Sequence, residues 1–152
     1  MTQKIMVTGA LGQIGSELVG ALREIYGTEN VLATDIKENE SVEDVYYERL
    51  DVLDESAISE MVSQHKITVV YHLAAMLSAT AEKDPRKGWD LNMESLLTFL
   101  DLAKEKKIQQ LYWPSSIAIF GNDTPKINTD QNALAIPTTV YGISKRSGEL
   151  WC

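Results

Sequence analysis

A tyrosine and a lysine stand four residues apart near the end of the 152-residue chain, in the segment Tyr141-Gly142-Ile143-Ser144-Lys145. Residues at this spacing lie on one face of a helix. A nearby ammonium group stabilises the phenolate form of a tyrosine, so such a pair can take a proton from an alcohol near neutral pH. With six tyrosines in the chain a chance match is possible, but Tyr141 is the only one followed by a lysine at this spacing.

Serine hydroxyls follow two of the strands that the sequence predicts. Ser115 and Ser116 close a strand over 110–116, and Ser78 comes just past a strand over 68–74. In open α/β sheets the ligand lies beyond the carboxyl ends of the strands, where a hydroxyl can hold a substrate oxygen. Serine is also favoured in turns and caps, and that interpretation stays open for all three.

A glycine-rich segment, Gly9-Ala10-Leu11-Gly12-Gln13-Ile14-Gly15, follows an apolar run and opens an amphipathic stretch. Gly9 permits a tight turn, Gly12 lets the backbone approach a pyrophosphate, and Gly15 lets the next helix lie close to a sheet. The N–H groups at that helix N-terminus suit phosphates. A plain strand-to-helix turn is the alternative, but the flanking strand and the acid Asp35 favour a dinucleotide site.

Asp35 stands twenty residues past Gly15, at the end of a second apolar run. Its carboxylate is placed to accept hydrogen bonds from ribose hydroxyls, and it would repel a 2′-phosphate. We therefore expect the cofactor to be NAD and not NADP. Lys37 lies close by in the sequence and could soften this preference.

Strand and helix patterns alternate along the chain, which predicts an α/β fold with a parallel sheet covered on both faces. We expect strands over 4–8, 31–35, 45–50, 68–74 and 110–116, and loops over 37–44 and 122–139. Helices should follow the glycine turn, ending at Gly27, follow an N-cap at Asp54, run over 89–106, and begin again at Tyr141. The side chains predicted to face inward are Ile14, Leu18, Leu22 and Ile25; Ile58, Met61 and Val62; and Met93, Leu96, Leu97, Leu100 and Ala103.

Composition narrows the classes of partner. The net charge is −8 and no basic stripe is visible, so nucleic acid is an unexpected partner. No apolar run approaches the ~18 residues of a membrane span, and we expect no membrane partner. His65 and His72 lack metal-ligand spacing, so no metal site is predicted. We expect His72 to be a packed structural residue in its strand and His65 to complement the dipole at a helix end.

The ends of the chain suggest where it belongs. The first strand begins almost at Met1, which leaves no room for a signal peptide, and the only cysteine, Cys152, permits no internal disulfide; a cytoplasmic protein fits both. The chain stops seven residues after Lys145, before a strand that would complete the last unit. We interpret residues 1–152 as one dinucleotide-binding domain, truncated before the C-terminal substrate domain of a longer enzyme.

Taken in order, these motifs resemble the markers of the extended short-chain dehydrogenases, the NAD-dependent epimerase/dehydratase family. The resemblance implies a Rossmann-type, doubly wound sheet. Segments 74–79 and 113–121 look most like the short-chain type of L-threonine 3-dehydrogenase, which implies NAD-dependent oxidation of the threonine C3 hydroxyl. The markers are Gly9-x-x-Gly12-x-x-Gly15, Asp35, Asp51-Val52, Leu73-Ala74-Ala75, Asn92, Ser115-Ser116 to Gly121, and Tyr141-x-x-x-Lys145.

The resemblance also implies a role for each residue. Tyr141 would be the general base, Lys145 its electrostatic partner and a ribose ligand, and Ser116, five residues before Gly121, the hydroxyl that orients the substrate. Ser78 and Tyr141 would contact the substrate as well. The resemblance places Asp51 and Val52 beside the adenine, Leu73, Ala74 and Ala75 along the cofactor path, and Asn92 near the site through a water. The other residues that it implies bind the cofactor are Gly9, Gly12, Gln13, Ile14, Gly15, Asp35, Tyr141 and Lys145. For Asn92 an ordinary polar residue on an exposed helix face remains the alternative.

Two other functions stay open at this point. A nucleotide-sugar epimerase or dehydratase would share the cofactor site and the Tyr-Lys pair, so the small-molecule substrate is either an amino acid or a nucleotide sugar. A non-catalytic NAD sensor would need only the glycine turn and Asp35. Members of the resembled family pair through the helices expected at 89–106 and after Tyr141, so the full-length protein is expected to be a homodimer. Residues 1–152 alone would leave Ile143 and Leu150 without cover, and we expect them to bind NAD weakly and turn over little.

Overall fold

The computed structural model describes residues 3–38 and 45–152, which form two compact units. The first unit comprises Met1–Ala74 and Ser95–Pro114, and the second comprises Ala75–Glu94 and Ser115–Cys152. Part of the loop predicted over 37–44, residues 39–44, lies outside the described residues. Within the described part of the chain, no helix is both long and apolar enough to cross a bilayer.

The first unit is built on a parallel five-stranded sheet with the strand order β3-β2-β1-β4-β5. This order confirms the doubly wound α/β fold that the alternating pattern predicts. The strands are β1 (Ile5–Thr8), β2 (Val31–Asp35), β3 (Tyr47–Arg49), β4 (Val69–His72) and β5 (Gln110–Tyr112). The last three are shorter than expected, and β5 ends before the serines that were predicted to close it.

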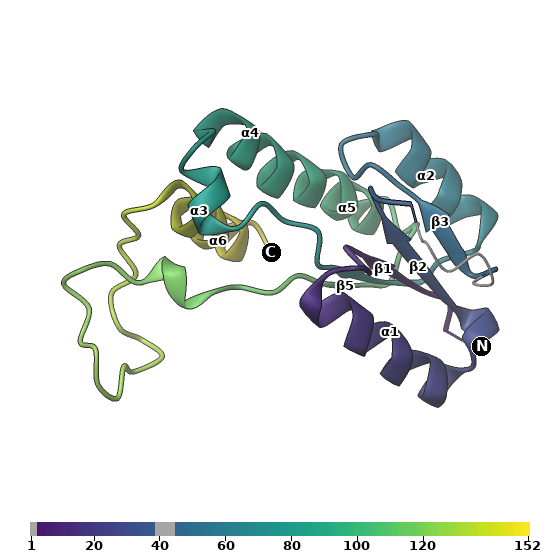
Figure 1. Ribbon diagram of the computed structural model, residues 1–152, viewed down its shortest axis with the longest axis horizontal. Helices are drawn as coiled ribbons and strands as arrows, with labels where there is room; N and C mark the ends of the chain where they lie inside the picture. The colour runs from purple at the N-terminus through teal and green to yellow at the C-terminus, as the bar shows by residue number, and fades with distance from the viewer. Residues whose placement is uncertain (1–2, 39–44) are drawn as a thin grey trace. The chain divides into compact units, whose positions relative to one another are not determined.

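Helices cover both faces of this sheet (Figure 1). Helix α1 (Gln13–Tyr26), followed by the short turn η1 (Thr28–Asn30), lies on one face; α2 (Glu55–Gln64) and α5 (Ser95–Lys104) lie on the other. Adjacent strand residues alternate between the two sides: Met6, Leu32 and Val70 pack with α2 and α5, while Ile5, Val7, Val31, Ala33 and Val69 pack with α1. Burial on both sides explains the nearly continuous apolar strands.

The buried face of α1 agrees with the prediction only in part: Leu22 is buried and Leu18 packs against the core, but the other two predicted residues are exposed. Ile14 and Ile25 are 64% and 72% exposed, and the buried residues are Gly15, Val19 and Leu22. Gly15 must lie against the glycine turn, which points the face that it shares with Val19 and Leu22 toward the sheet. The helix ends at Gly27, as predicted, where φ is +89°.

Helix α2 follows the prediction more closely. The Asp54 carboxylate accepts the Ala57 N–H at 3.0 Å and caps the helix, and Ile58, Met61 and Val62 are buried. Such a cap satisfies one of the N–H groups that the first turn of a helix leaves without an intrahelical partner.

The long helix predicted over 89–106 is three consecutive elements. Helix α4 (Pro85–Trp89) begins earlier, the π-helical turn η2 (Asp90–Glu94) follows, and α5 completes the run. Within α5 the buried stripe contains Leu96, Phe99 and Leu102, whereas the predicted Leu97 and Leu100 are only half-buried. Apolar residues occur almost all round this helix, so their periodicity alone did not fix the face that packs.

The second unit is small and mostly helical. It contains α3 (Ser78–Ala81), α4, η2, the short turn η3 (Ile117–Ile119) and α6 (Val140–Trp151). Between η3 and α6 the chain forms the long irregular loop that its Asn, Asp, Thr and Pro content predicted (Figure 1). Helix α6 is capped by Thr139, whose hydroxyl accepts the Gly142 N–H at 3.0 Å.

Candidate active site

The glycine turn of the first unit has the close contacts that its sequence predicts. Gly9 has φ +68°, and a Cβ there would lie 2.8 Å from the backbone nitrogen of Ala74. A Cβ on Gly15 would lie 2.2 Å from the carbonyl oxygen of Gly9, a distance that no real side chain tolerates. The turn is closed by a hydrogen bond from the Gly12 N–H to the Gly9 carbonyl at 3.0 Å. The turn therefore requires glycine at positions 9 and 15.

The N-terminus of α1 is open for an anion. Among the described residues, no side chain caps α1 at Gly12, and its first turn holds no acidic residue. Gly12, Gln13 and Ile14 are exposed. The first N–H groups of a helix have no intrahelical partner and carry a partial positive charge. These features fit the pyrophosphate of a dinucleotide.

Asp35 ends β2 beside the glycine turn and also stabilises it. One carboxylate oxygen accepts the Leu11 N–H at 3.1 Å, and the other accepts the Lys37 N–H at 3.2 Å. A carboxylate can accept about four hydrogen bonds, so it keeps capacity for ribose hydroxyls. The sequence predicted the ribose contact but missed the bond to Leu11, which ties the acid to the turn.

The other residues expected along the cofactor path lie in several environments. Asp51 is exposed and its carboxylate accepts the Leu53 N–H at 3.0 Å, whereas Val52 is 6% exposed and belongs to the core. Leu73, Ala74 and Ala75 follow β4 and are half-buried. Burial of Val52 leaves Asp51 as the more accessible of the two residues predicted beside the adenine.

A buried polar chain supports the backbone after β4. The Ala74 N–H donates to Thr8 Oγ1 at 3.4 Å, Thr8 Oγ1 lies 2.7 Å from His72 Nδ1, and His72 Nε2 lies 2.8 Å from Ser95 Oγ. His72 is 1% exposed and its ring packs against Phe99 at 4.8 Å. His72 is therefore the packed structural histidine that was predicted. Through Thr8, this chain of hydrogen bonds joins the end of β1 to Ala74, which lies beside Gly9.

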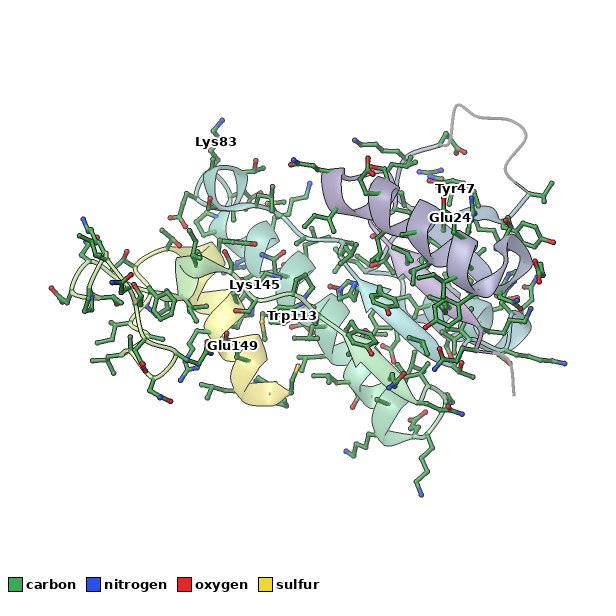
Figure 2. The ribbon with its side chains drawn as sticks, turned by 90° about the horizontal axis from the view of Figure 1, so that it is seen from below. Glu24, Tyr47, Lys83, Trp113, Lys145 and Glu149 are labelled. Carbon is green, nitrogen blue, oxygen red and sulfur yellow. The ribbon has the colours of Figure 1, made fainter. Side chains whose placement is uncertain are left out.

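The second unit brings the tyrosine and the lysine together. The Lys145 Nζ lies 5.7 Å from the centre of the Tyr141 ring, so both side chains share one face of α6, as predicted. Lys145 is 3% exposed, and burial lowers its pKa from 10.5 to about 8. It is thus still mostly protonated at neutral pH, in surroundings where a charge acts strongly. Figure 2 shows Lys145 on α6 with Glu149 one turn further along.

The two serines after β5 have different partners. Ser116 is half-buried and caps η3, because its Oγ accepts the Ala118 N–H at 3.2 Å; its own proton can still be donated to a substrate oxygen. Ser115 donates its proton to Glu149 Oε1 at 2.5 Å. Both serines therefore have the local structural role left open as an alternative, and only Ser116 keeps its proton for a ligand. Ser78 is exposed at the start of α3.

Asn92 is 2% exposed, which excludes the alternative of a polar residue on an exposed helix face. It lies in the π-helical turn η2, where its Oδ1 accepts the Met76 N–H at 2.8 Å and its Nδ2 donates to the Met76 carbonyl at 3.1 Å and to Ser144 Oγ at 3.3 Å. Ser144 in turn donates to the Tyr141 carbonyl at 2.8 Å. Asn92 thus holds the segment before Ser78 and helix α6 together. Sequence reasoning missed Ser144 and the π turn, although such turns are common at functional sites.

The chain matches the sequence profile of the NAD dependent epimerase/dehydratase family over residues 5–152. It belongs to this family. An epimerase/dehydratase of Staphylococcus saprophyticus, described as uncharacterized, is 50% identical over 99% of this chain and 48% of its own length. Family membership implies a nicotinamide dinucleotide cofactor, in agreement with the glycine turn and Asp35.

Two solved structures that resemble this chain are structures of different enzymes. A GalE-like L-threonine dehydrogenase from Cupriavidus necator, in its holo form, is 49% identical with a TM-score of 0.94, over 98% of this chain and 49% of that one. A UDP-glucose 4-epimerase from Thermotoga maritima, with UDP-glucose, is 28% identical with a TM-score of 0.85, over 98% of this chain and 50% of that one. This epimerase/dehydratase chain spans about half the length of the relatives it matches.

Proposed function

We propose that this chain is the NAD-binding part of an oxidoreductase that converts the C3 hydroxyl of L-threonine to the ketone of 2-amino-3-oxobutanoate. The observation that carries the proposal is the buried Lys145 ammonium 5.7 Å from the Tyr141 ring. Support for threonine comes from the likeness to the C. necator L-threonine dehydrogenase at 49% identity.

Each residue has a defined task in the proposed reaction. Ser116 donates a hydrogen bond to the substrate hydroxyl oxygen and orients it, and Ser78 contacts the same substrate. Tyr141 takes the hydroxyl proton, and Lys145 stabilises the phenolate that does so. NAD, when bound, supplies the acceptor for the hydride that leaves C3. Asn92 and Ser144 hold the backbone of Tyr141 in place through their hydrogen bonds.

The first unit is proposed to hold the cofactor. The N–H groups at the start of α1 bind the pyrophosphate, and the Asp35 carboxylate accepts hydrogen bonds from both hydroxyls of the adenosine ribose. The negative charge of Asp35 selects NAD over NADP. The exposed Ile14, the exposed Asp51 and the backbone of residues 73–75 are proposed to line the cofactor.

The complete protein is proposed to act in the cytoplasm as a homodimer. Ile143 and Leu150 on α6 are 42% and 72% exposed, as expected for residues that another part of the protein or a second copy covers. Gel filtration of the full-length protein would show a mass of two chains. A monomer that retains full activity would rule out the dimer.

The direct test replaces Tyr141 by phenylalanine in the full-length protein. Wild type is expected to produce NADH absorbance from NAD and L-threonine, and Tyr141→Phe should lose turnover at least a hundredfold because the proton acceptor is gone. NAD binding should be kept, since the glycine turn and Asp35 are unchanged. Tyr26→Phe, on helix α1 of the first unit, is the matched control. Unchanged turnover in Tyr141→Phe would disprove the assigned role.

A second candidate is a nucleotide-sugar epimerase, which the likeness to the T. maritima UDP-glucose 4-epimerase favours. Turnover of UDP-glucose without oxidation of threonine would support it. Tight NAD binding with no turnover of either substrate would instead indicate a non-catalytic NAD sensor.

A further inference from the structure

The segment that carries Ser116 is attached to α6 by a carboxylate one turn beyond Lys145. Glu149 accepts the Ser115 hydroxyl proton on Oε1 at 2.5 Å and pairs with Arg146 Nη1 through Oε2 at 2.9 Å. Both carboxylate oxygens are thus engaged, and both partners belong to the same compact unit. The sequence singled out Ser115 as a candidate substrate contact, but in the structure its proton goes to Glu149.

The same segment touches α6 at a second point. A Cβ on Gly142 would lie 2.1 Å from the Ala118 carbonyl oxygen, so η3 lies directly against the first turn of α6. Gly142 and Glu149 are seven residues apart, about 10 Å along a helix. Ser116 lies between the two contacting residues of its own segment, Ser115 and Ala118. Lys145 lies between the two contact points on α6.

The contacts at Gly142 and Glu149 together restrict residues 115–118 more than either contact would alone. The Gly142 contact holds Ala118 against the first turn of α6, and the Ser115–Glu149 hydrogen bond holds the other end of residues 115–118 near the end of that helix. Together the two contacts set where the neighbouring Ser116 hydroxyl lies along α6. Small misplacements of a group that orients a substrate lower rates strongly.

The chemistry of Glu149 suits a permanent acceptor. Burial raises the pKa of this carboxyl, but the hydrogen bonds from Ser115 and Arg146 and the charge of Arg146 outweigh burial, and the pKa lies below its ordinary value. Glu149 is therefore ionised throughout the neutral range. A hydrogen bond to an ionised acceptor is stronger than one between neutral groups.

We infer that Glu149 is a positioning residue, which holds the Ser116 hydroxyl in register with Tyr141 through its hydrogen bond to Ser115. This inference rests on the proposed function, because it concerns the placement of the substrate-orienting serine. Glu149 itself touches neither substrate nor cofactor in this scheme.

The test is a double-mutant cycle in the full-length protein. Ser115→Ala and Glu149→Ala should each lower kcat about tenfold, and the double variant should fall no further because both changes remove the same bond. The dissociation constant for NAD should stay within twofold, since the glycine turn is untouched. Glu149→Gln keeps an acceptor oxygen for Ser115 and should recover most of the lost kcat, which a purely electrostatic role would not allow. Arg146→Ala, which removes the ion pair but not the serine bond, is the matched control.

The outcomes separate this inference from the proposed function. If wild type oxidises threonine while both alanine variants keep kcat within twofold, the inference fails and the proposed function stands. Losses that multiply in the double variant, or no rescue by Glu149→Gln, would also overturn it. If wild type oxidises no alcohol, the proposed function fails and the inference falls with it.

Discussion

The buried charge of Lys145 should lower the free energy of unfolding of the protein. The lysine side chain is 3% exposed, and burial lowers its pKa from 10.5 to about 8. One pKa unit corresponds to about 1.4 kcal/mol, so burying the charged lysine costs the folded state about 3 kcal/mol at any pH where the folded protein keeps it protonated. Replacing Lys145 with methionine, which keeps the length of the side chain without its charge, should remove this cost.

The sign of the pH dependence follows from proton binding. Between about pH 8 and 10.5 the unfolded chain still binds the Lys145 proton and the folded chain has released it. The free energy of unfolding of wild type therefore rises with pH across this window relative to the methionine variant. The stability of Lys145→Met relative to wild type should therefore be greatest at pH 7 and fall by about 2 kcal/mol between pH 7 and pH 9.5.

Denaturant unfolding of the full-length protein at a series of pH values measures this difference directly. Other titrating groups are common to both proteins and cancel. The exposed Lys83, labelled in Figure 2, provides the control: Lys83→Met should change stability by less than about 0.5 kcal/mol at every pH. Lys145→Met should also lose turnover, so the variant is both more stable and inactive. A stability difference that is the same at pH 7 and 9.5 would refute the reasoning.

Two further predictions concern the cofactor half of the chain. Gly15→Ala should destabilise the first unit by about 3 kcal/mol or more and abolish NAD binding, because the new Cβ would lie 2.2 Å from the Gly9 carbonyl oxygen. The control is Gly20→Ala, where nothing lies within 4 Å of the new Cβ, and it should stabilise α1 by about 0.5–1 kcal/mol. Thermal unfolding and NAD titration of both variants test this pair, and equal stability of the two would contradict it. Asp35→Asn should weaken NAD binding about tenfold or more and reduce the preference for NAD over NADP, because the carboxylate bonds to ribose and the repulsion of a 2′-phosphate are both lost. An unchanged ratio of the dissociation constants for NAD and NADP would show that Asp35 does not select the cofactor.

Local patterns were sufficient where one residue type has one physical role. Gly9 and Gly15 were placed correctly because only glycine leaves room for contacts so close, and Gly27 because glycine adopts its φ of +89° without strain. Asp54 was recognised as a cap by its position before an apolar stripe. The alternation of strands and helices was enough to predict a parallel α/β sheet, but it left the strand order β3-β2-β1-β4-β5 open, because right-handed crossovers allow more than one order.

Predictions failed where several residues could fill the same role. On α1 the prediction held for Leu22 but failed for Ile14 and Ile25, which look like core residues although the contact of Gly15 turns them outward. On α5 it held for Leu96 and Ala103 but chose Leu97 and Leu100 instead of Phe99 and Leu102, because leucines lie nearly all round the helix. In both helices the choice depends on the neighbouring element, which a single periodicity does not contain.

The sequence by itself determined the parallel α/β architecture, the glycine turn with its acid, and the shared helix face of Tyr141 and Lys145, because each depends on residues close together in the chain or on a close contact that only glycine permits. Only the tertiary structure decided that Lys145 is buried, that Ser115 is bound by Glu149 while Ser116 keeps its proton, and that Asn92 holds Met76 and Ser144. Those facts depend on which side chains meet after residues 16 to 52 positions apart are brought into contact, and spacing along a chain does not fix such meetings.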